Sequence, residues 1–122
     1  MTERITESEL AVLERLWMSA PQTATQIGSG IADERNWTMA TVKTLLARLV
    51  AKGALATEQD GRRFLYRPLV AREDYSTRES RRLIDRLFGG RVSPLVAHLA
   101  EHETLSDSDI ADLKDIIARL EK

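Results

Sequence analysis

The stretch Asn36–Gly53, NWTMATVKTLLARLVAKG, predicts the central helix of this chain. Its apolar residues recur at i, i+3, i+4, i+7 and i+8, the spacing of one helix face. They are Val42, Leu45, Leu46, Leu49 and Val50. Thr38 can cap the helix start, because its oxygen can accept from the free N–H groups of the first turn. Gly53 can take the left-handed conformation that ends many helices.

The opposite face of this helix carries short side chains with longer ones at its edges. The short residues are Ala40, Thr44, Ala47 and Ala51, and the flanking residues are Thr41, Lys43 and Arg48. Such a face can approach the major groove of DNA, where Ala and Thr can touch a thymine methyl and Arg can reach guanine. The alternative is an alanine-rich solvent face with no binding role.

Composition limits the classes of protein that this chain can belong to. With 122 residues, 30% charged and 5% aromatic, it is one domain, or a small domain with an appendage, and rich in helix. Neither membrane insertion nor secretion is predicted, since no 18-residue apolar run or signal pattern is present. The absence of cysteine excludes disulfides and thiolate metal sites. We therefore expect a cytoplasmic protein.

The net charge of −1 conceals a local basic excess. Residues 36–67 carry six Lys and Arg against two Asp and Glu. A nucleic-acid surface needs a local patch rather than a basic total, so this excess supports the interpretation of the helix face.

Two shorter helices are predicted upstream. Ile5–Met18 begins with a capping box at Thr6 and Glu9, and its expected buried stripe is Leu10, Leu13, Leu16 and Trp17. Thr23–Ala32 repeats the capping box with Thr23 and Gln26. The short connection Asp33–Trp37 would complete a helix-turn-helix. Gly28 and Gly30 within the second helix indicate either close packing or fraying.

A β-hairpin is predicted after Gly53. Leu55 begins an extended segment, Asp60-Gly61 is a strong two-residue turn, and Arg63–Arg67 returns. A hairpin directly after a helix-turn-helix forms a wing, with Arg62 and Arg63 at its tip near the DNA backbone. The alternative for Arg62 is a solvated turn residue.

The last third predicts three helices with little interior of their own. They are Val70–Phe88, a short helix capped by Ser93 with Pro94 at its first position, and a last helix capped by Ser106 and Asp109. Their apolar faces are better buried against a second copy. The predicted dimerisation residues are Leu83, Ile84, Leu87, Leu95, Leu99, Ile110, Leu113, Ile116, Ile117 and Leu120.

Several segments together resemble the BlaI/MecI/CopY family of bacterial repressors, also called penicillinase repressors. The matching segments are Glu9–Trp17, Asn36–Thr38, Thr41–Leu49, Lys52-Gly53, Arg62–Tyr66 and Leu105–Leu113. The resemblance implies a mainly α fold with a small β-hairpin: a winged helix-turn-helix DNA-binding domain, residues 1–70, and an α-helical dimerisation domain, residues 71–122. It also implies binding of a homodimer to double-stranded operator DNA with inverted TACA/TGTA-like half-sites, and a role in antibiotic resistance.

The same resemblance assigns roles to individual residues. It makes Thr41, Lys43, Thr44 and Arg48 recognition-helix candidates, and Arg62 and Arg63 wing candidates. Thr38, Ala40 and Ala47 complete the predicted DNA-binding set.

The resemblance also bears on induction, the step that would relieve repression. The β-lactam-responsive branch of the family is cut by a membrane sensor protease at an Asn–Phe bond. The matching position here is His98-Leu99, so that motif is absent and His98 and Leu99 mark only a candidate cleavage region. The cysteine cluster of the copper-responsive branch is absent as well. One alternative is a repressor of the same fold that is gated by a metal or small ligand instead of proteolysis. The other is a winged-helix module that binds protein instead of DNA.

No enzyme, cofactor or metal site is predicted. The carboxylates are scattered, and no nucleophile–base–orienter set is evident. His98 and His102 are spaced i, i+4 with Glu101 and Glu103 nearby, which can suit a metal ion. The interpretation we prefer is a polar helix edge, because two histidines without a third ligand are weak support for a metal site.

Overall fold

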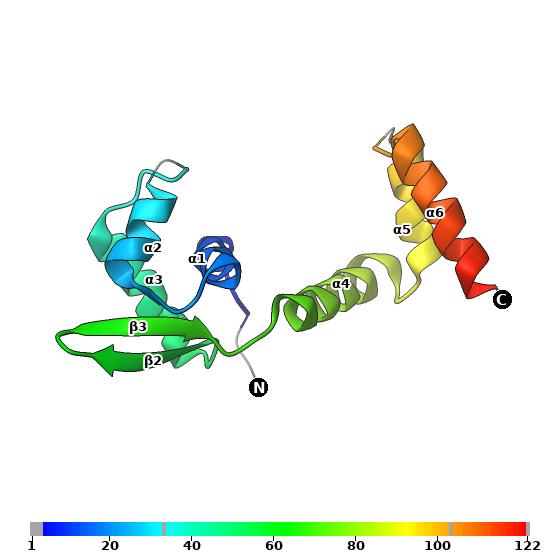
Figure 1. Ribbon diagram of the computed structural model, residues 1–122. Helices are drawn as coiled ribbons and strands as arrows, with labels where there is room; N and C mark the ends of the chain where they lie inside the picture. Colours follow the sequence, from blue (N-terminus) through cyan, green and yellow to red (C-terminus); the bar gives the residue numbers. More distant parts are fainter. Residues whose placement is uncertain (1–3, 33, 103, 122) are drawn as a thin grey trace. The chain divides into compact units, whose positions relative to one another are not determined.

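The computed structural model describes residues 4–32, 34–102 and 104–121 (Figure 1). Its elements are α1 (Glu7–Met18), β1 (Gln22–Thr23), α2 (Ala24–Ile31), α3 (Met39–Ala51), β2 (Leu55–Asp60), β3 (Arg63–Pro68), α4 (Arg72–Phe88), α5 (Val92–Glu101) and α6 (Asp107–Leu120). The chain forms two compact units, Met1–Ser76 and Thr77–Lys122, and the boundary falls within α4.

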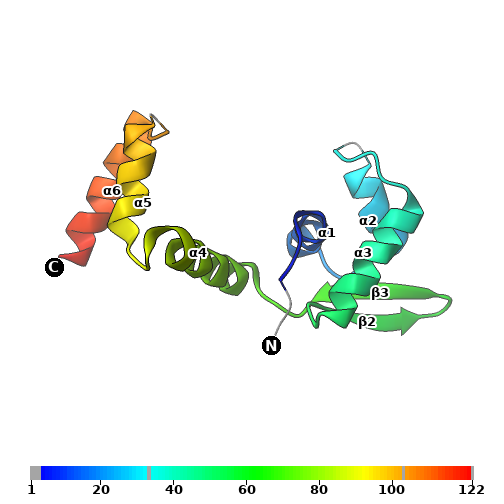
Figure 2. The ribbon, with the colours of Figure 1, turned by 180° about the vertical axis from the view of Figure 1, so that it is seen from behind.

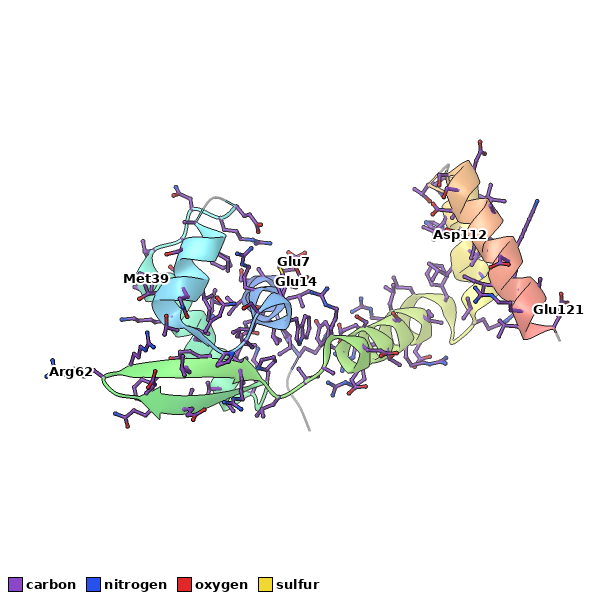
Figure 3. The ribbon with its side chains drawn as sticks, viewed as in Figure 1. Glu7, Glu14, Met39, Arg62, Asp112 and Glu121 are labelled. Atoms are coloured by element: carbon purple, nitrogen blue, oxygen red, sulfur yellow. The ribbon has the colours of Figure 1, made fainter. Side chains whose placement is uncertain are left out.

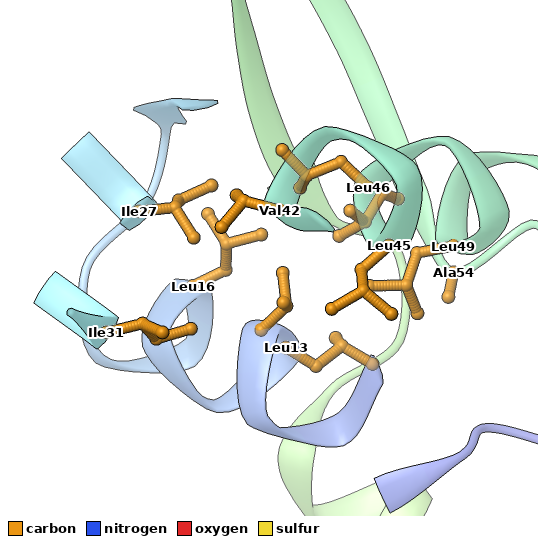
Figure 4. Packing of buried hydrophobic residues seen from close by; sticks show 11 residues of the cluster. Leu13, Leu16, Ile27, Ile31, Val42, Leu45, Leu46, Leu49 and Ala54 are labelled. Atoms are coloured by element: carbon orange, nitrogen blue, oxygen red, sulfur yellow. The ribbon is translucent and has the colours of Figure 1, made fainter. Parts of the chain in front are cut away.

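The hydrophobic core of the first unit lies between α1, α2 and α3 (Figure 4). The core residues are Val12, Leu13, Leu16, Ile27, Ile31, Val42, Leu45, Leu46, Leu49, Ala54 and Leu55. The predicted apolar stripe of α3 is confirmed at four of its five positions. It is wrong at Val50, which is exposed because it lies at the edge of the buried arc. Trp17 is half-buried and packs against the core.

A three-stranded antiparallel sheet completes this unit, in the order β1-β3-β2. Gln22 and Thr23 pair with Tyr66 and Leu65, which places β3 in the centre. The strand β1 was not predicted, because two residues are too few to show a period. Helix-turn-helix and hairpin together form a winged helix, and the hairpin tip reaches beyond the helices in Figures 1 and 2.

The hairpin turn lies one residue later than predicted. Asp60 is the last residue of β2 and pairs with Arg63, so the two turn residues are Gly61 and Arg62. Gly61 has φ +66°, a left-handed conformation that glycine adopts without steric cost. The shift matters because it moves Arg62 into the turn itself.

Helix starts follow their predicted caps in four of five cases, including α3, which Thr38 caps as predicted. The capping boxes of Thr6 with Glu9, Thr23 with Gln26, and Ser106 with Asp109 are all formed. The prediction is wrong for α5, which begins at Val92 with Arg91 as its cap residue and no side-chain capping bond. A helix can begin there without a side-chain cap because its first N–H groups can bond to water instead. Thr23 lies outside α2 as its cap, and α4 begins at Arg72 rather than Val70.

The two glycines of α2 permit close packing rather than fraying. A β-carbon on Gly28 would lie 2.6 Å from Sδ of Met39, and one on Gly30 would overlap the guanidinium of Arg15. Both neighbouring atoms are at the far end of flexible side chains.

In the predicted connection Asp33–Trp37, residue 33 lies outside the described residues.

Trp17 joins α1 to the segment that leads into α4. Its indole N–H donates a hydrogen bond of 2.8 Å to the carbonyl oxygen of Val70. The ring of Tyr75 lies 5.7 Å from the Trp17 ring, and the guanidinium of Arg72 lies 5.2 Å above it. The first turn of α4 is therefore held against the first unit.

Candidate nucleic-acid interface

Helix α3 presents most of the predicted DNA-contacting side chains to solvent. The exposed residues are Thr38, Ala40, Lys43, Thr44, Ala47 and Arg48. Thr41 is half-buried, and its hydroxyl lies 3.2 Å from that of Thr38. The face has small residues in its middle and long cationic ones at its edges, so it can approach a groove closely.

Hydrogen bonds within the helix orient the threonine hydroxyls of this face. Thr38 Oγ1 accepts from the backbone N–H of Thr41 at 3.2 Å, which caps the helix. Thr44 Oγ1 donates to the carbonyl oxygen of Ala40 at 2.9 Å. Because its proton is used inside the helix, the Thr44 hydroxyl can offer an acceptor to a ligand.

Three of the six cations in residues 36–67 are paired with carboxylates. Lys52 pairs with Glu9, Arg63 with Asp60 at 3.0 Å, and Arg67 with Glu58 at 2.6 Å. The remaining three are Lys43, Arg48 and Arg62, and these form no ion pair among residues 4–32, 34–102 and 104–121. Within residues 36–67, the positive charge that remains available is thus on α3 and at the hairpin tip.

Arg62 and Arg63 differ although they are neighbours. Arg62 projects from the end of the hairpin (Figure 3). Arg63 donates through Nε and Nη2 to one carboxylate oxygen of Asp60, at 3.2 and 3.0 Å. Arg62 is therefore the wing cation that can approach a phosphate without first breaking an ion pair.

A buried ion pair that was not predicted from the sequence holds the carboxyl end of α3 against α1. Glu9 is 0% exposed, and its Oε1 accepts from Lys52 Nζ at 2.5 Å and from the backbone N–H of Thr6 at 2.8 Å. Lys52 also donates to the carbonyl oxygen of Arg4 at 2.8 Å. Glu9 Oε2 has no hydrogen-bond partner in the described part of the chain.

The electrostatics of Glu9 follow from these contacts. Burial by itself raises the pKa of Glu9, because the charged form loses water. Hydrogen bonds from Lys52 and Thr6, together with the positive charge of Lys52, outweigh burial and hold the pKa below its ordinary value. Glu9 is therefore ionised at neutral pH, and its charge serves the orientation of α3.

None of the predicted dimerisation residues is fully buried within one chain. Leu83, Leu87, Ile110, Ile116, Ile117 and Leu120 are exposed, and Ile84, Leu95, Leu99 and Leu113 are half-buried. Ile117 is 54% exposed and Leu120 is 79% exposed. In the described residues of Thr77–Lys122 no side chain is fully buried, so this unit has an apolar surface but no core.

The two histidines lie on consecutive turns at the end of α5. His98 is exposed, and its ring centre is 4.3 Å from that of His102, whose Nδ1 lies 2.8 Å from the carbonyl oxygen of His98. Among the residues that the structure describes, no three His, Cys, Asp or Glu side chains are placed to hold a metal ion. Glu103 lies outside those residues.

None of the helices within the described ranges is long and apolar enough to span a membrane.

Comparisons with known proteins agree with this arrangement. Residues 5–119 match the family model described as penicillinase repressor. The methicillin resistance regulatory protein MecI of Mammaliicoccus sciuri is 31% identical over 116 residues, which cover 95% of this chain and 94% of that protein.

Two solved structures resemble the first part of the chain. The solution structure of the DNA-binding domain of the repressor BlaI has 30% sequence identity and a TM-score of 0.55, and the match covers 62% of this chain and 94% of that one. Monomeric BlaI of Bacillus licheniformis, in complex with the blaP half-operator, has 29% identity and a TM-score of 0.53, with 62% and 92% covered. The winged helix, the exposed face of α3 and the match over nearly the whole chain lead to one conclusion: the protein belongs to the penicillinase repressor family, whose members are transcriptional repressors and not enzymes.

Proposed function

We propose that this DNA-binding repressor acts as a homodimer that inserts α3 of each copy into the major groove at one half of a dyad operator. Residues 1–70 would bind DNA and residues 71–122 would dimerise. The observation that carries the proposal is the exposed face of α3, where Lys43 and Arg48 flank small side chains and form no ion pair within the described residues.

The residues of this surface fit different parts of duplex DNA. Arg48 can donate two hydrogen bonds to the O6 and N7 atoms of a guanine, the commonest specific contact in the major groove. Ala47 and Thr44 are small enough to touch a thymine methyl. Arg62, at the hairpin tip, can contact a phosphate, which positions the protein without reading sequence.

We propose dimerisation because no described side chain of the second unit is fully buried in one copy. Its exposed apolar side chains, among them Leu87, Ile117 and Leu120, lack a covering surface in one copy. A second copy would cover them through a two-fold interface. The two α3 helices would then reach half-sites about one helical turn or a little more apart, and the paired contacts would raise affinity beyond that of one half-site.

Relief by proteolysis is the mode of induction that we propose. The candidate bond His98-Leu99 lies in α5, where His98 is exposed. A cut there would separate α6, with Ile116 and Leu120, from the rest of the chain. Each DNA-binding domain alone would then bind too weakly to compete with non-specific DNA. A membrane-bound sensor protease would be the partner in this step.

Footprinting on the DNA upstream of its own gene tests operator binding. Arg48→Ala should weaken protection and relax sequence choice, with a cost of about 1–3 kcal/mol for a lost bidentate base contact. Lys114→Ala, which removes an exposed cation from α6, should leave the footprint unchanged. If wild-type protein fails to protect any segment at low ionic strength, the proposed function is wrong. If the Arg48 and Lys114 variants give equal footprints, Arg48 does not contact the operator.

A further inference from the structure

A row of arginines runs along the second unit's part of α4. Arg78, Arg82 and Arg86 are spaced i, i+4, i+8, so they rise about 6 Å per step along one side of the helix. A shallow groove on this side is lined by Thr77, Arg78, Arg81, Arg82, Asp85 and Arg86. We call the four arginines of this lining, Arg78, Arg81, Arg82 and Arg86, the α4 arginine face.

Little of this charge is neutralised within the chain. Arg82 pairs with Glu79 at 3.1 Å. Arg78, Arg81 and Arg86 form no ion pair with any residue that the structure describes. Asp85 also lines the groove, so four guanidinium groups meet two carboxylates, those of Glu79 and Asp85, and an excess of positive charge remains.

Arg78, Arg82 and Arg86 lie away from the apolar side of the same helix, whereas Arg81 borders it next to Phe88. At about 100° per residue, the arginines centre nearly opposite the apolar residues Leu83, Ile84, Leu87 and Phe88. If a second copy covers the apolar side, the side with Arg78, Arg82 and Arg86 remains open to solvent. The proposed dimer therefore does not account for it.

We propose that the α4 arginine face binds the phosphate backbone of duplex DNA, as a second contact surface outside the winged helix. This inference rests on the proposed function. Duplex DNA is a linear array of closely spaced negative charges, and cations on three successive turns of one helix side can follow such an array. All four groups are guanidinium, which binds phosphate with two parallel hydrogen bonds where an ammonium acts as a point charge. The contact would be independent of sequence.

The variant Arg78→Gln, Arg82→Gln, Arg86→Gln tests this surface, because glutamine is a good helix former without charge. Its matched control is Arg91→Gln, Lys114→Gln, Arg119→Gln, which removes the same charge from exposed positions elsewhere in the second unit. The full chain is titrated with a non-operator duplex and with the upstream fragment between 50 and 200 mM salt. Each lost phosphate contact should shallow the plot of log K against log salt by about 0.9. We expect a slope shallower by about 2–3 units per bound protomer for the arginine variant, and no change for the control.

Three results would overturn the proposal, and each is distinct from a failure of the proposed function. Equal slopes for both variants, with operator binding intact, would mean that α4 does not touch DNA. A monomeric arginine variant in sedimentation would assign the face to the contact between copies. Binding of a poly-glutamate peptide that competes with neither DNA nor dimerisation would assign it to an acidic protein. A wild-type chain that binds no DNA would instead end the proposed function itself.

Discussion

Glu9 illustrates how one residue serves two purposes at the start of the chain. Its side chain completes the capping box of α1 with Thr6, and it also receives the ammonium of Lys52 at the end of α3. Lys52 is 12% exposed, so the ion pair is largely removed from water. Removing one partner of a buried pair leaves an uncompensated charge, which is costly.

We expect Lys52→Met to lower the free energy of unfolding by about 3–5 kcal/mol, measured by urea denaturation. Arg67→Met is the matched control, because its pair with Glu58 is exposed and such pairs contribute about 0–1 kcal/mol. Adding Glu9→Gln to Lys52→Met should recover much of the loss, since glutamine keeps the capping acceptor without a buried charge. A Lys52 variant as stable as the Arg67 control would contradict this account.

The lowered pKa of Glu9 predicts a specific acid sensitivity. The carboxylate contributes stability above its ordinary pKa of 4.5, and this contribution is lost as pH falls below that value through the lowered folded-state pKa. The difference in unfolding free energy between wild type and Glu9→Gln should therefore narrow between pH 5 and pH 3. Urea midpoints measured across that range provide the check. A difference that is constant with pH would mean that Glu9 is not stabilised in its charged form.

At the level of elements, the proposed binding surface consists of α3, which would contact bases, and the hairpin, which would contact the DNA backbone. The hairpin carries its free cation in the turn, whereas Arg63 and Arg67 on its strands are paired with Asp60 and Glu58. Both pairs are exposed, so each contributes about 0–1 kcal/mol, but each engages a guanidinium that would otherwise be available to a phosphate. The wing should therefore act mainly through Arg62.

Arg62→Gln should lower affinity on all DNA sequences by a similar factor and shallow the salt slope by about one unit. Arg63→Gln should have a smaller effect on the slope, because its guanidinium already faces Asp60. Fluorescence anisotropy on operator and non-operator duplexes measures both variants. A loss confined to the operator would mean that Arg62 reads bases instead.

At the scale of the whole molecule, the second unit lacks a filled interior. Three helices carry apolar faces, and no described side chain among them is fully buried. About 50 residues cannot bury a large share of their surface alone. The proposed association of two copies would cover these faces, and it would also produce the symmetry that the proposed dyad operator requires.

Replacing Ile116 and Leu120 with asparagine should shift the protein to monomers in sedimentation velocity, because both side chains lie on the exposed apolar face of α6. The same replacement at Ala111 and Ala118, which lie on another side of the helix, is the control and should leave the dimer intact. Operator affinity should fall together with dimer formation, while the winged helix stays folded. Persistence of the dimer would place the interface elsewhere.

The sequence alone determined the features that depend on near neighbours. Helix periods, the three capping boxes and the hairpin all arise from residues a few positions apart, so local spacing was enough to find α1, α2, α3, β2, β3, α4 and α6. The exposed face of α3 followed from the same periodicity. The hairpin turn was missed by one position and the start of α5 by two, because several residues there satisfy the same local preferences.

The tertiary structure decided what depends on residues far apart. It showed which cations are free, because Lys52 meets Glu9 43 positions away and Arg67 meets Glu58 across the hairpin. It also revealed β1, which exists only because β3 provides its hydrogen-bond partners. Charge counts and periodicities contain no information on such pairings. The physical reason is that a buried ion pair or a strand edge is formed by folding, which brings together groups that the sequence keeps separate.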